Sequence, residues 1–456
     1  MKILIKGAGD LATGIASRLY HAGHQIMMTE IDVPLTVRRT VAFSRAVYEQ
    51  EVIVEDMKGI LVSSMQEAQK VFQDGDIAVI VDPSAEIRKE YQPDVIVDAI
   101  LAKKNLGTTI TDAAFVIGVG PGFTAGEDCH CVVETKRGHT LGSVIWEGSA
   151  IPNTGVPGNV GGYTIERLIK ASANGVIEPK VSIGEMVEQG QLVAMTGNQP
   201  VYAQMPGIVR GMLQDGVFVT EGLKIGDIDA RCEVLHCHTI SDKAKAIGGG
   251  VLEAVSNFER INGRYAIVVL AAGESSRFGG EKLLEEIEGK PMYQHMLEKA
   301  SAFGGLCKVI VTGNPQIKNT AKLLGFDVIE NKESKKGISH SLKLALTFLL
   351  QKQAMVQGVL FAVCDQPWIR ISTIQKIVNE GALHPNHIIC AGHCGERGNP
   401  VFWGKKYFNE LLKTEGDFGG KQIMKYHEEH IKMVECTLAE LKDIDRRTDL
   451  ANQKLQ

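Results

Sequence analysis

The sequence predicts an α/β protein in which a small β barrel-sandwich domain separates two Rossmann-like domains. Two observations lead to this prediction. In the first and last parts of the chain, short apolar runs alternate with helical patterns, which is typical of strands and helices that build a parallel sheet. In the middle part, short β-runs are separated by glycine-containing turns at near-regular spacing, which indicates an all-β unit. We expect the domains to span residues 1–170, 171–262 and 263–456.

Size and composition narrow the class of protein. The chain has 456 residues, 44% of them apolar, so about two to four domains with ordinary cores are expected. The formal net charge is -5, which gives no electrostatic reason to expect nucleic acid or an anionic membrane as partner. No apolar run is long enough to span a bilayer. The nine cysteines are scattered and odd in number, as in proteins with reduced thiols, so we expect a cytoplasmic protein.

The first domain shows the alternation most clearly. Strands are expected at Lys2–Lys6, Gln25–Thr29, Ile77–Val81 and Asp94–Asp98, because each is a short apolar run. Between the first two, Leu11–Ala22 has apolar positions at helical spacing. A strand, a helix and a second strand in this order predict a parallel βαβ unit.

The middle region, about Gly175 to Arg231, contains the phrase V-x-x-G-x-x-V-x-x-G-Q and a later P-G-x-V. It resembles the barrel-sandwich fold of biotinyl and lipoyl carrier domains, which carry a modified lysine at a hairpin tip. The corresponding stretch here, Met195–Asn198, has no lysine, so the resemblance implies the fold and not the swinging-arm function. Beyond it, a short helix is expected to follow Gly248–Gly250 and end near Ile261.

The last domain opens with a strand, Ala266–Leu270, that runs directly into the loop Leu270–Gly279. Small residues let the backbone of such a loop approach a ligand, and its N–H groups can converge on phosphate oxygens. Arg277 and Lys282 follow at spacings that can place two cations over a triphosphate. The alternative is a glycine-rich turn with surface cations, but the combination of strand, loop and cations favours a phosphate site. The small residues are Ala271, Ala272 and Gly273.

Further along this domain, the strand Gly358–Val363 ends just before Asp365. A carboxylate at a strand end is well placed for a hard cation such as Mg²⁺, although an aspartate before a proline can also serve a turn or a helix cap. Ser341 lies near the start of an amphipathic helix that continues to Leu350. Its hydroxyl either caps the helix or contacts a nucleotide, and capping is the commoner role.

These stretches resemble the MobA-like NTP transferases over roughly Tyr265–Leu450. In that family the loop holds the NTP phosphates, the lysine matching Lys282 lies near the β- and γ-phosphates, and the aspartate matching Asp365 binds Mg²⁺. The resemblance rests on Leu270–Lys282, the Gly337/Ser341-Leu342 element, Val363–Pro367, Gly398–Val401, the Gly416-Asp417-x-Gly419 turn and Asp443–Asp445.

The resemblance implies roles for individual residues. Arg277, Lys282 and Asp365 are the expected catalytic residues. Asp445 and Asp417 are further candidate metal ligands, although the sequence departs from the family pattern directly after Asp445. The expected nucleotide-binding residues are Leu270, Ala271, Ala272, Gly273, Ser275, Lys282 and Ser341, and the expected substrate-binding residues are Asn399, Pro400 and Asp417.

The Ala-Ala-Gly start of the loop indicates a branch of the family. It resembles the molybdenum cofactor cytidylyltransferases, whereas the guanylyl branch usually has Ala-Gly-Gly. The implied reaction joins CTP and molybdenum-molybdopterin into a cytosine dinucleotide and releases pyrophosphate, with Mg²⁺ as cofactor. Two alternatives stay open: a guanylyltransferase or another small-molecule nucleotidyltransferase, and a chaperone that delivers finished cofactor without turnover.

A second nucleotide site is possible near the N-terminus. Gly7, Gly9 and Ala12 fit G-x-G-x-x-A between a strand and a helix, and Glu30 ends the next strand where a ribose-binding acid is expected. However, Asp10 lies where a pyrophosphate would rest, and its charge repels phosphate. Dinucleotide binding and a purely structural turn are therefore both open.

The N-terminal region also resembles a family, the YqeB-type accessory proteins of selenium-dependent molybdenum hydroxylases, over about Lys2–Val255. A molybdenum hydroxylase apoenzyme is the implied partner. The cluster of Glu134, Arg137 and His139 either lines a site or pairs internally, and we expect internal pairing. The matching stretches are Ile5–Gly14, Thr29–Ile31, Pro34, Arg38-Arg39 and Val133–Gly142.

Overall fold

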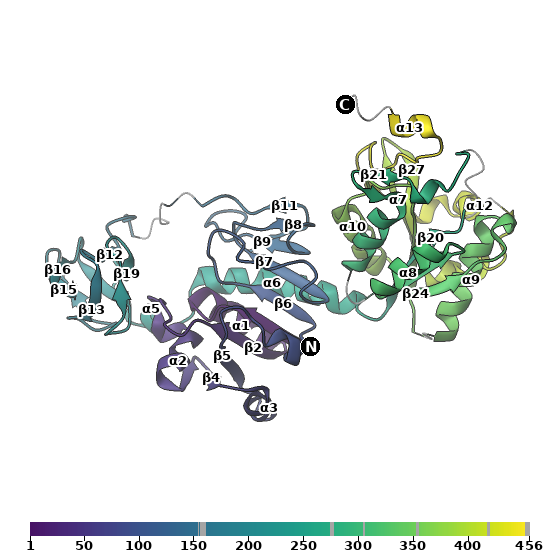
Figure 1. Cartoon of the computed structure of the whole chain (residues 1–456). Coiled ribbons are helices and arrows are strands. Elements are labelled where there is room, and N and C mark those ends of the chain that lie inside the picture. The colour runs from purple at the N-terminus through teal and green to yellow at the C-terminus, as the bar shows by residue number, and fades with distance from the viewer. Residues whose placement is uncertain are drawn as a thin grey trace. The chain divides into compact units, whose positions relative to one another are not determined.

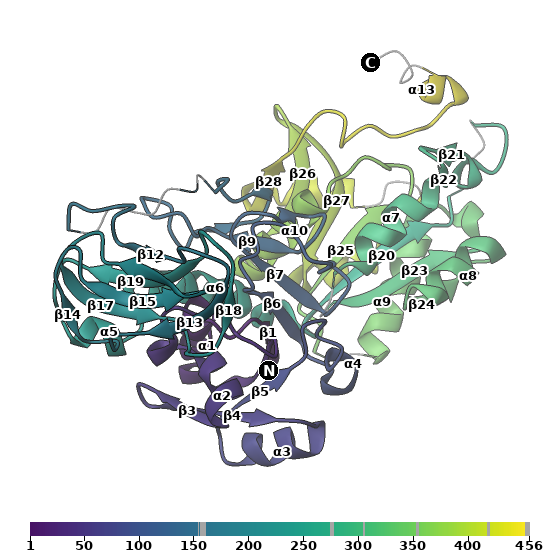
Figure 2. The same ribbon diagram turned by 60° about the vertical axis from the view of Figure 1, so that its left-hand side comes forward.

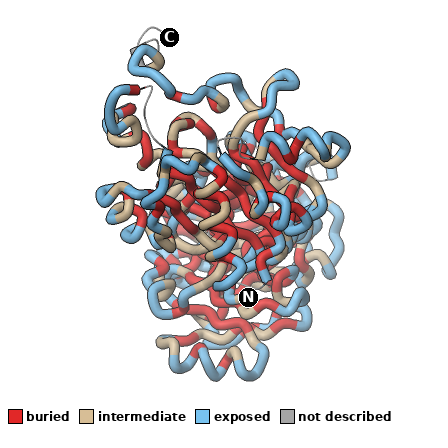
Figure 3. Tube along the Cα trace, turned by 90° about the vertical axis from the view of Figure 1, so that its right-hand side faces the viewer, coloured by how far each residue is buried: buried red, intermediate tan, exposed pale blue. Residues whose placement is uncertain are grey.

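The computed structural model of the chain describes residues 1–153, 155, 161–273, 278–303, 306–352, 355–416 and 420–451 (Figure 1). The chain divides into two compact units, Met1–Val255 and Ser256–Gln456. Within each unit, buried positions gather in the interior and exposed positions lie mainly at turns and outer helix faces (Figure 3). Of the helices in the described ranges, none is long and apolar enough to cross a membrane.

The first unit is built on a sheet that has nine strands over its described residues, in the order β10-β9-β7-β6-β1-β2-β5-β4-β3 (Figure 2). The central strands β5, β2, β1, β6 and β7 are parallel, and their order is that of a Rossmann fold, which confirms the predicted fold. The strands are β1 Lys2–Lys6, β2 Gln25–Glu30, β3 Glu51–Val54, β4 Met57–Val62, β5 Ile77–Val81, β6 Val95–Asp98, β7 Phe115–Val119, β9 Cys131–Val133 and β10 Val144–Ile145, beside the separate pair β8 Thr124–Ala125 and β11 Gly148–Ser149.

Helices connect these strands. α1 begins directly after the turn that follows β1, at the place where the sequence predicts a helix. The helices are α1 Asp10–His21, α2 Ala46–Glu49, α3 Met65–Gln73, α4 Arg88–Tyr91, α5 Leu235–His238 and α6 Asp242–Ile261.

α6 differs from the prediction. The expected short helix after the glycines is wrong, because a single 20-residue helix runs through them. The glycines are needed for close packing and do not interrupt the helix. A Cβ on Gly248 would lie 2.4 Å from the carbonyl oxygen of Gly14, and one on Gly250 would lie 2.0 Å from that of Gly142. Close packing therefore offsets the low helix propensity of glycine.

The middle region forms two antiparallel four-stranded sheets, as far as its residues are described. Alternate side chains of both sheets point into one shared core, in which Ile177, Val193 and Ile228 are fully buried. This arrangement confirms the predicted barrel-sandwich fold. The strands are β12 Leu168–Lys170, β13 Gly175–Pro179, β14 Met186–Val187, β15 Leu192–Thr196, β16 Gln199–Tyr202, β17 Gly207–Met212, β18 Phe218–Val219 and β19 Lys224–Asp229.

The second unit contains a sheet with seven strands in its described part, in the order β24-β23-β20-β25-β27-β26-β28. β20 is parallel to β23 and β25, whereas β27 is antiparallel to both of its neighbours. The strands are β20 Tyr265–Ala271, β23 Cys307–Thr312, β24 Asp327–Glu330, β25 Gly358–Val363, β26 Ile388–His393, β27 Glu396–Gly404 and β28 Ile431–Glu435, beside the short pair β21 Glu286–Ile287 and β22 Lys290–Pro291.

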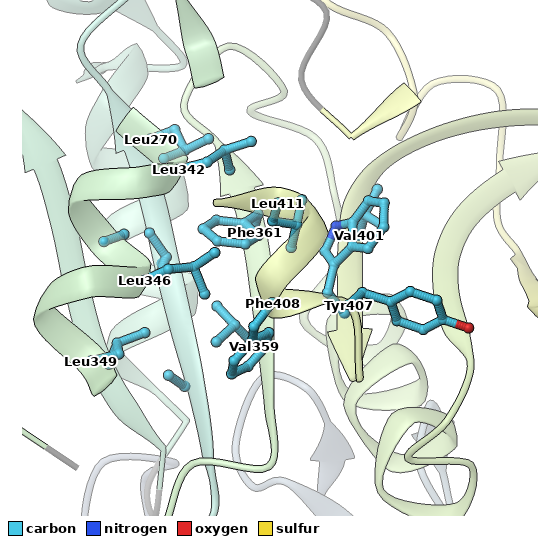
Figure 4. Packing of buried hydrophobic residues seen from close by; sticks show 14 of the residues in the cluster. Leu270, Leu342, Leu346, Leu349, Val359, Phe361, Val401, Tyr407, Phe408 and Leu411 are labelled. Atoms are coloured by element: carbon cyan, nitrogen blue, oxygen red, sulfur yellow. The ribbon is translucent and has the colours of Figure 1, made fainter. Parts of the chain in front are cut away.

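α9 covers one face of this sheet. Leu342, Leu346 and Leu349 lie on one side of the helix because they are three or four positions apart, and they pack against Phe361 and Phe408 (Figure 4). Complete burial of one such side chain contributes about 1.5–3 kcal/mol. The helices are α7 Met292–Ser301, α8 Pro315–Leu323, α9 Ile338–Lys352, α10 Ile371–Leu383, α11 Phe408–Leu411, α12 Lys421–Tyr426 and α13 Arg447–Ala451.

Candidate active site

The candidate site lies where β20 and β25 end. Because the two strands are parallel neighbours, with Leu270 paired to Val363, the residues that follow them meet at the same edge of the sheet. Ala272 and Gly273 follow β20, and a Cβ on Gly273 would meet no atom of the described residues within 4 Å. The start of the loop is therefore open to a ligand. The predicted site residues Ser275 and Arg277 lie outside the described residues.

A cavity of about 390 Å³, here called the loop pocket, opens at this edge. It brings together seven of the predicted site residues from four distant parts of the chain. They are Leu270, Ala272, Gly273, Lys282, Ser341, Asp365 and Asp445. Ala271 is buried and lines a second cavity of about 550 Å³ on the other side of the loop, which Ala272 and Gly273 also line.

Lys282 lines the loop pocket beside both carboxylates. It begins a short 3-10 helix, Lys282–Leu284. Its Nζ lies 2.8 Å from Oδ2 of Asp365 and 3.3 Å from Oδ1 of Asp445. Burial alone would lower the pKa of Lys282, but the charge of Asp365 and hydrogen bonds to both carboxylates outweigh burial, so its pKa is raised. The ammonium group therefore keeps its charge at neutral pH.

Several contacts hold the segment of Asp365 in place. The N–H of Ile444 donates to the carbonyl oxygen of Asp365 at 3.0 Å, which ties the strand end to the C-terminal segment. Lys299 of α7 donates from Nζ to the carbonyl oxygen of Pro367. Burial lowers the pKa of Lys299 to about 8. Both contacts tie the segment of Asp365 to other parts of the domain.

The two carboxylates around Lys282 could also hold a metal ion. Asp365 and Asp445 each present an oxygen to the same point in the pocket, and carboxylate oxygens are the ligands that Mg²⁺ prefers. The donor set therefore fits Mg²⁺. Asp417, the other predicted ligand, lies outside the described residues.

Ser341 and Lys335 form part of the pocket wall. Ser341 lines the pocket from within α9, so it is not the helix cap, and its Oγ accepts a hydrogen bond from Nδ2 of Asn331 at 3.0 Å. Lys335, in the 3-10 helix Ser334–Lys336, lines the pocket as a further cation. Lys335 is not among the site residues predicted from the sequence, although the lysine-rich run before Gly337 indicates a cation there.

An adjoining cavity of about 480 Å³ shares Leu270, Ile338 and Val363 with the loop pocket. Asn399, predicted to bind substrate, lines it together with Gln366, and Asp443 lies at its wall. Pro400 is buried and is not among the lining residues of this cavity. Two connected cavities at one strand edge give room for two substrates.

The predicted N-terminal site also forms a cavity, of about 470 Å³, lined by Gly7, Gly9, Ala12 and Glu30. The carboxylate of Glu30 already accepts hydrogen bonds from the N–H groups of Ala8 and Ile31, at 3.0 and 2.9 Å. Burial raises its pKa. Glu30, the acid expected to bind a ribose, therefore also stabilises the glycine-containing turn through its hydrogen bond with Ala8.

Asp10, at the first turn of α1, is paired with Arg38, with 3.4 Å between Oδ2 and Nη1. In the nearby cluster, the carboxylate of Glu134 accepts three backbone N–H bonds, and Arg137 makes a two-pronged contact with Asp242 at 2.7 and 2.9 Å. Glu134 and Arg137 therefore each have hydrogen-bond partners within the protein, as expected from the sequence.

The sequence of the second unit matches a known family. Residues 267–431 match the family described as the MobA-like NTP transferase domain. The C-terminal region contains a MobA-like NTP transferase domain. The start of the β20 loop, Lys282 and Asp365, which line the loop pocket, lie within the matched residues, whereas Asp445 lies beyond them.

Individual relatives match different parts of the chain. The uncharacterized protein YqeB of Escherichia coli strain K12 is 50% identical over 253 residues, which are 56% of this chain and 47% of YqeB. A probable molybdenum cofactor guanylyltransferase of Thermococcus sibiricus is 40% identical over 65 residues, 14% of this chain and 33% of that protein. The chain thus spans less than half the length of either relative. The crystal structure of Rv0371c from Mycobacterium tuberculosis covers 42% of this chain and 97% of its own, with 23% identity and a TM-score of 0.35.

Proposed function

We propose that the C-terminal domain transfers a nucleotidyl group from an NTP to a phosphorylated small molecule. The observation that carries this proposal is the position of Lys282 between Asp365 and Asp445, beside the open start of the β20 loop. The cation can offset part of the charge of a triphosphate and the two carboxylates can hold its Mg²⁺, and nucleotidyl transfer requires both.

The reaction needs no protein nucleophile. An oxygen of the acceptor's phosphate forms a bond to the α-phosphorus of the NTP, and the bond from that phosphorus to the bridging oxygen of the β-phosphate breaks. Pyrophosphate leaves with the electron pair. Bound Mg²⁺ would supply charge neutralisation at the phosphate oxygens. Lys282 and the loop N–H groups align the phosphates and stabilise the charge that moves onto pyrophosphate.

We further propose CTP as the nucleotide and molybdenum-molybdopterin as the acceptor. The Ala-Ala-Gly start of the loop supports CTP, because Ala272 lines both cavities beside the loop and its methyl group leaves less room than glycine. The family of the domain and the partial match to a probable molybdenum cofactor guanylyltransferase support a molybdenum-pterin acceptor. The adjoining cavity with Asn399 is the proposed place for that acceptor.

A pyrophosphate-release assay tests the proposal. We expect the full chain, with Mg²⁺ and molybdenum-molybdopterin, to release pyrophosphate fastest from CTP when ATP, GTP, CTP and UTP are compared. The matched variant Ala272→Gly should narrow the preference for CTP over GTP. A wild-type preference for GTP would replace the cytidylyl proposal by a guanylyl one. Tight binding of finished cofactor without pyrophosphate release from any NTP would favour a delivery chaperone.

For the first unit, we propose a role in maturing a selenium-dependent molybdenum hydroxylase. Its relation to YqeB and its fusion to the transferase domain support this role, since fusion raises the local concentration of one unit's product at the other. We expect the intact chain to activate a hydroxylase apoenzyme faster than an equimolar mixture of the two units. Equal rates would argue against channelling between them.

A further inference from the structure

Four histidines form a cluster in the second unit, away from the loop pocket. They come from two H-x-x-H sequences, His384–His387 and His427–His430. The first precedes β26 and the second precedes β28. These strands are parallel neighbours, with Ile388 paired to Ile431, so the histidine that directly precedes each strand lies beside its counterpart.

The ring positions agree with this register. The ring centroids are 5.4 Å apart for His384 and His387, 5.7 Å for His387 and His430, and 6.3 Å for His427 and His430. The cluster lies where β26 and β28 begin. Since β27 runs antiparallel between β25 and β26, this is the sheet edge opposite to Asp365. The nucleotide chemistry proposed above does not use these histidines.

The ligand atoms are close enough to share one ion. His427, Glu429 and His430 each offer one ligand atom, and the three atoms lie within 4.8 Å of one another. Nδ1 of His430 is 2.8 Å from Oε1 of Glu429. Zinc binds imidazole nitrogen and carboxylate oxygen at about 2.0–2.1 Å, so two ligands of one tetrahedral ion are about 3.3 Å apart. Side-chain rotations that bring the atoms closer by up to about 1.5 Å would reach that spacing.

His427 also has a carboxylate partner. Its Nε2 lies 2.9 Å from Oε2 of Glu410, and its ring packs edge-on against Tyr407 with centroids 5.0 Å apart. An imidazole that donates Nε2–H to a carboxylate has its Nδ1 lone pair available for a metal. Metal-bound histidines in proteins commonly have such a carboxylate partner.

One imidazole nitrogen of the cluster lacks a hydrogen bond. Nδ1 of His387 is buried and has no hydrogen-bond partner among the residues described. A buried polar atom without a partner is costly, and a metal ion would remove this cost.

We propose that His387, His427, Glu429 and His430 bind one divalent transition-metal ion of the zinc class. Imidazole nitrogens with a carboxylate oxygen are a ligand set suited to such ions and not to Mg²⁺. The ion joins the chain ahead of β26 to the chain ahead of β28 and so stabilises the edge of the sheet.

Zinc binding to the full-length protein tests the proposal. After dialysis against a chelator, we expect the chain to bind about one Zn²⁺ with excess Mg²⁺ present, and its melting temperature to rise with added Zn²⁺. The double variant His427→Ala/His430→Ala should bind Zn²⁺ at least about 100-fold more weakly and lose the thermal shift. Glu410→Gln, which changes only the partner of His427, should weaken binding about 10-fold to 100-fold.

The domain offers a matched control, since His393, Cys394 and Glu435 form another group with metal-ligating side chains. The variant His393→Ala/Cys394→Ser should keep the zinc affinity and the thermal shift. Bound Co²⁺ should give the visible absorption of tetrahedral coordination in this control and not in His427→Ala/His430→Ala. If the double variant does not fold, the exposed Glu429→Gln replaces it. Unchanged zinc affinity in that variant or in the double variant, or loss of binding in the control, would overturn the proposal.

Discussion

Replacing Asp365 by asparagine is expected to reduce pyrophosphate release about 100-fold to 1,000-fold at ordinary Mg²⁺ concentrations. The carboxylate of Asp365 is the proposed metal ligand nearest to Lys282, at 2.8 Å from its Nζ. A metal ion contributes several kcal/mol to stabilising a phosphoryl transition state, and each 1.36 kcal/mol changes the rate tenfold. Because the loss arises from weaker Mg²⁺ binding, a higher Mg²⁺ concentration should restore part of the rate.

Asp327→Asn is the matched control for this prediction. Asp327 is also paired with a lysine, Lys352, at 2.6 Å, but it lies on β24 at the other edge of the sheet and is outside the loop pocket. The control should keep wild-type turnover and the wild-type dependence on Mg²⁺. Near-normal Mg²⁺-dependent pyrophosphate release by Asp365→Asn would exclude Asp365 as the metal ligand and remove the main support for the proposed chemistry.

Local sequence patterns predicted several strands in both units. The strands Lys2–Lys6, Ile77–Val81 and Gly358–Val363 lie at the predicted residues, because short apolar runs bounded by turn residues have few other ways to be buried. The segment Gly248–Gly250 misled the prediction, since glycine has low helix propensity. Its helical state depends on close contacts with Gly14 and Gly142, which are distant in the sequence.

The same limit applies to the side chains around the sites. Asp445 reaches Lys282 only because the C-terminal segment returns to the end of β25. There the N–H of Ile444 donates a hydrogen bond to the carbonyl oxygen of Asp365. The two H-x-x-H sequences become one cluster only through the register of β26 and β28. A single sequence shows which chemical groups are present, but pairings between distant strands require the fold.

Replacing Lys282 by methionine is expected to reduce pyrophosphate release about 100-fold to 1,000-fold, in the range found when one charge-stabilising donor is removed from an active site. Unlike the loss in Asp365→Asn, this loss should not respond to Mg²⁺, because the metal ligands remain and the missing group is the cation that balances charge on pyrophosphate. Nucleotide binding should weaken much less than turnover. Lys282→Arg should recover part of the rate by restoring the charge.

Lys290→Met is the matched control for Lys282→Met, since Lys290 forms an exposed ion pair with Glu298 at 2.6 Å and is expected to leave turnover unchanged. A parallel measurement of the melting temperature separates chemistry from stability. Removal of Lys282 leaves Asp365 and Asp445 without the cation between them, so the metal-free variant should be less stable and should be stabilised more by Mg²⁺ than the wild type. If Lys282→Met instead lost nucleotide binding and turnover equally, Lys282 would act in ground-state binding and not in stabilising the leaving pyrophosphate.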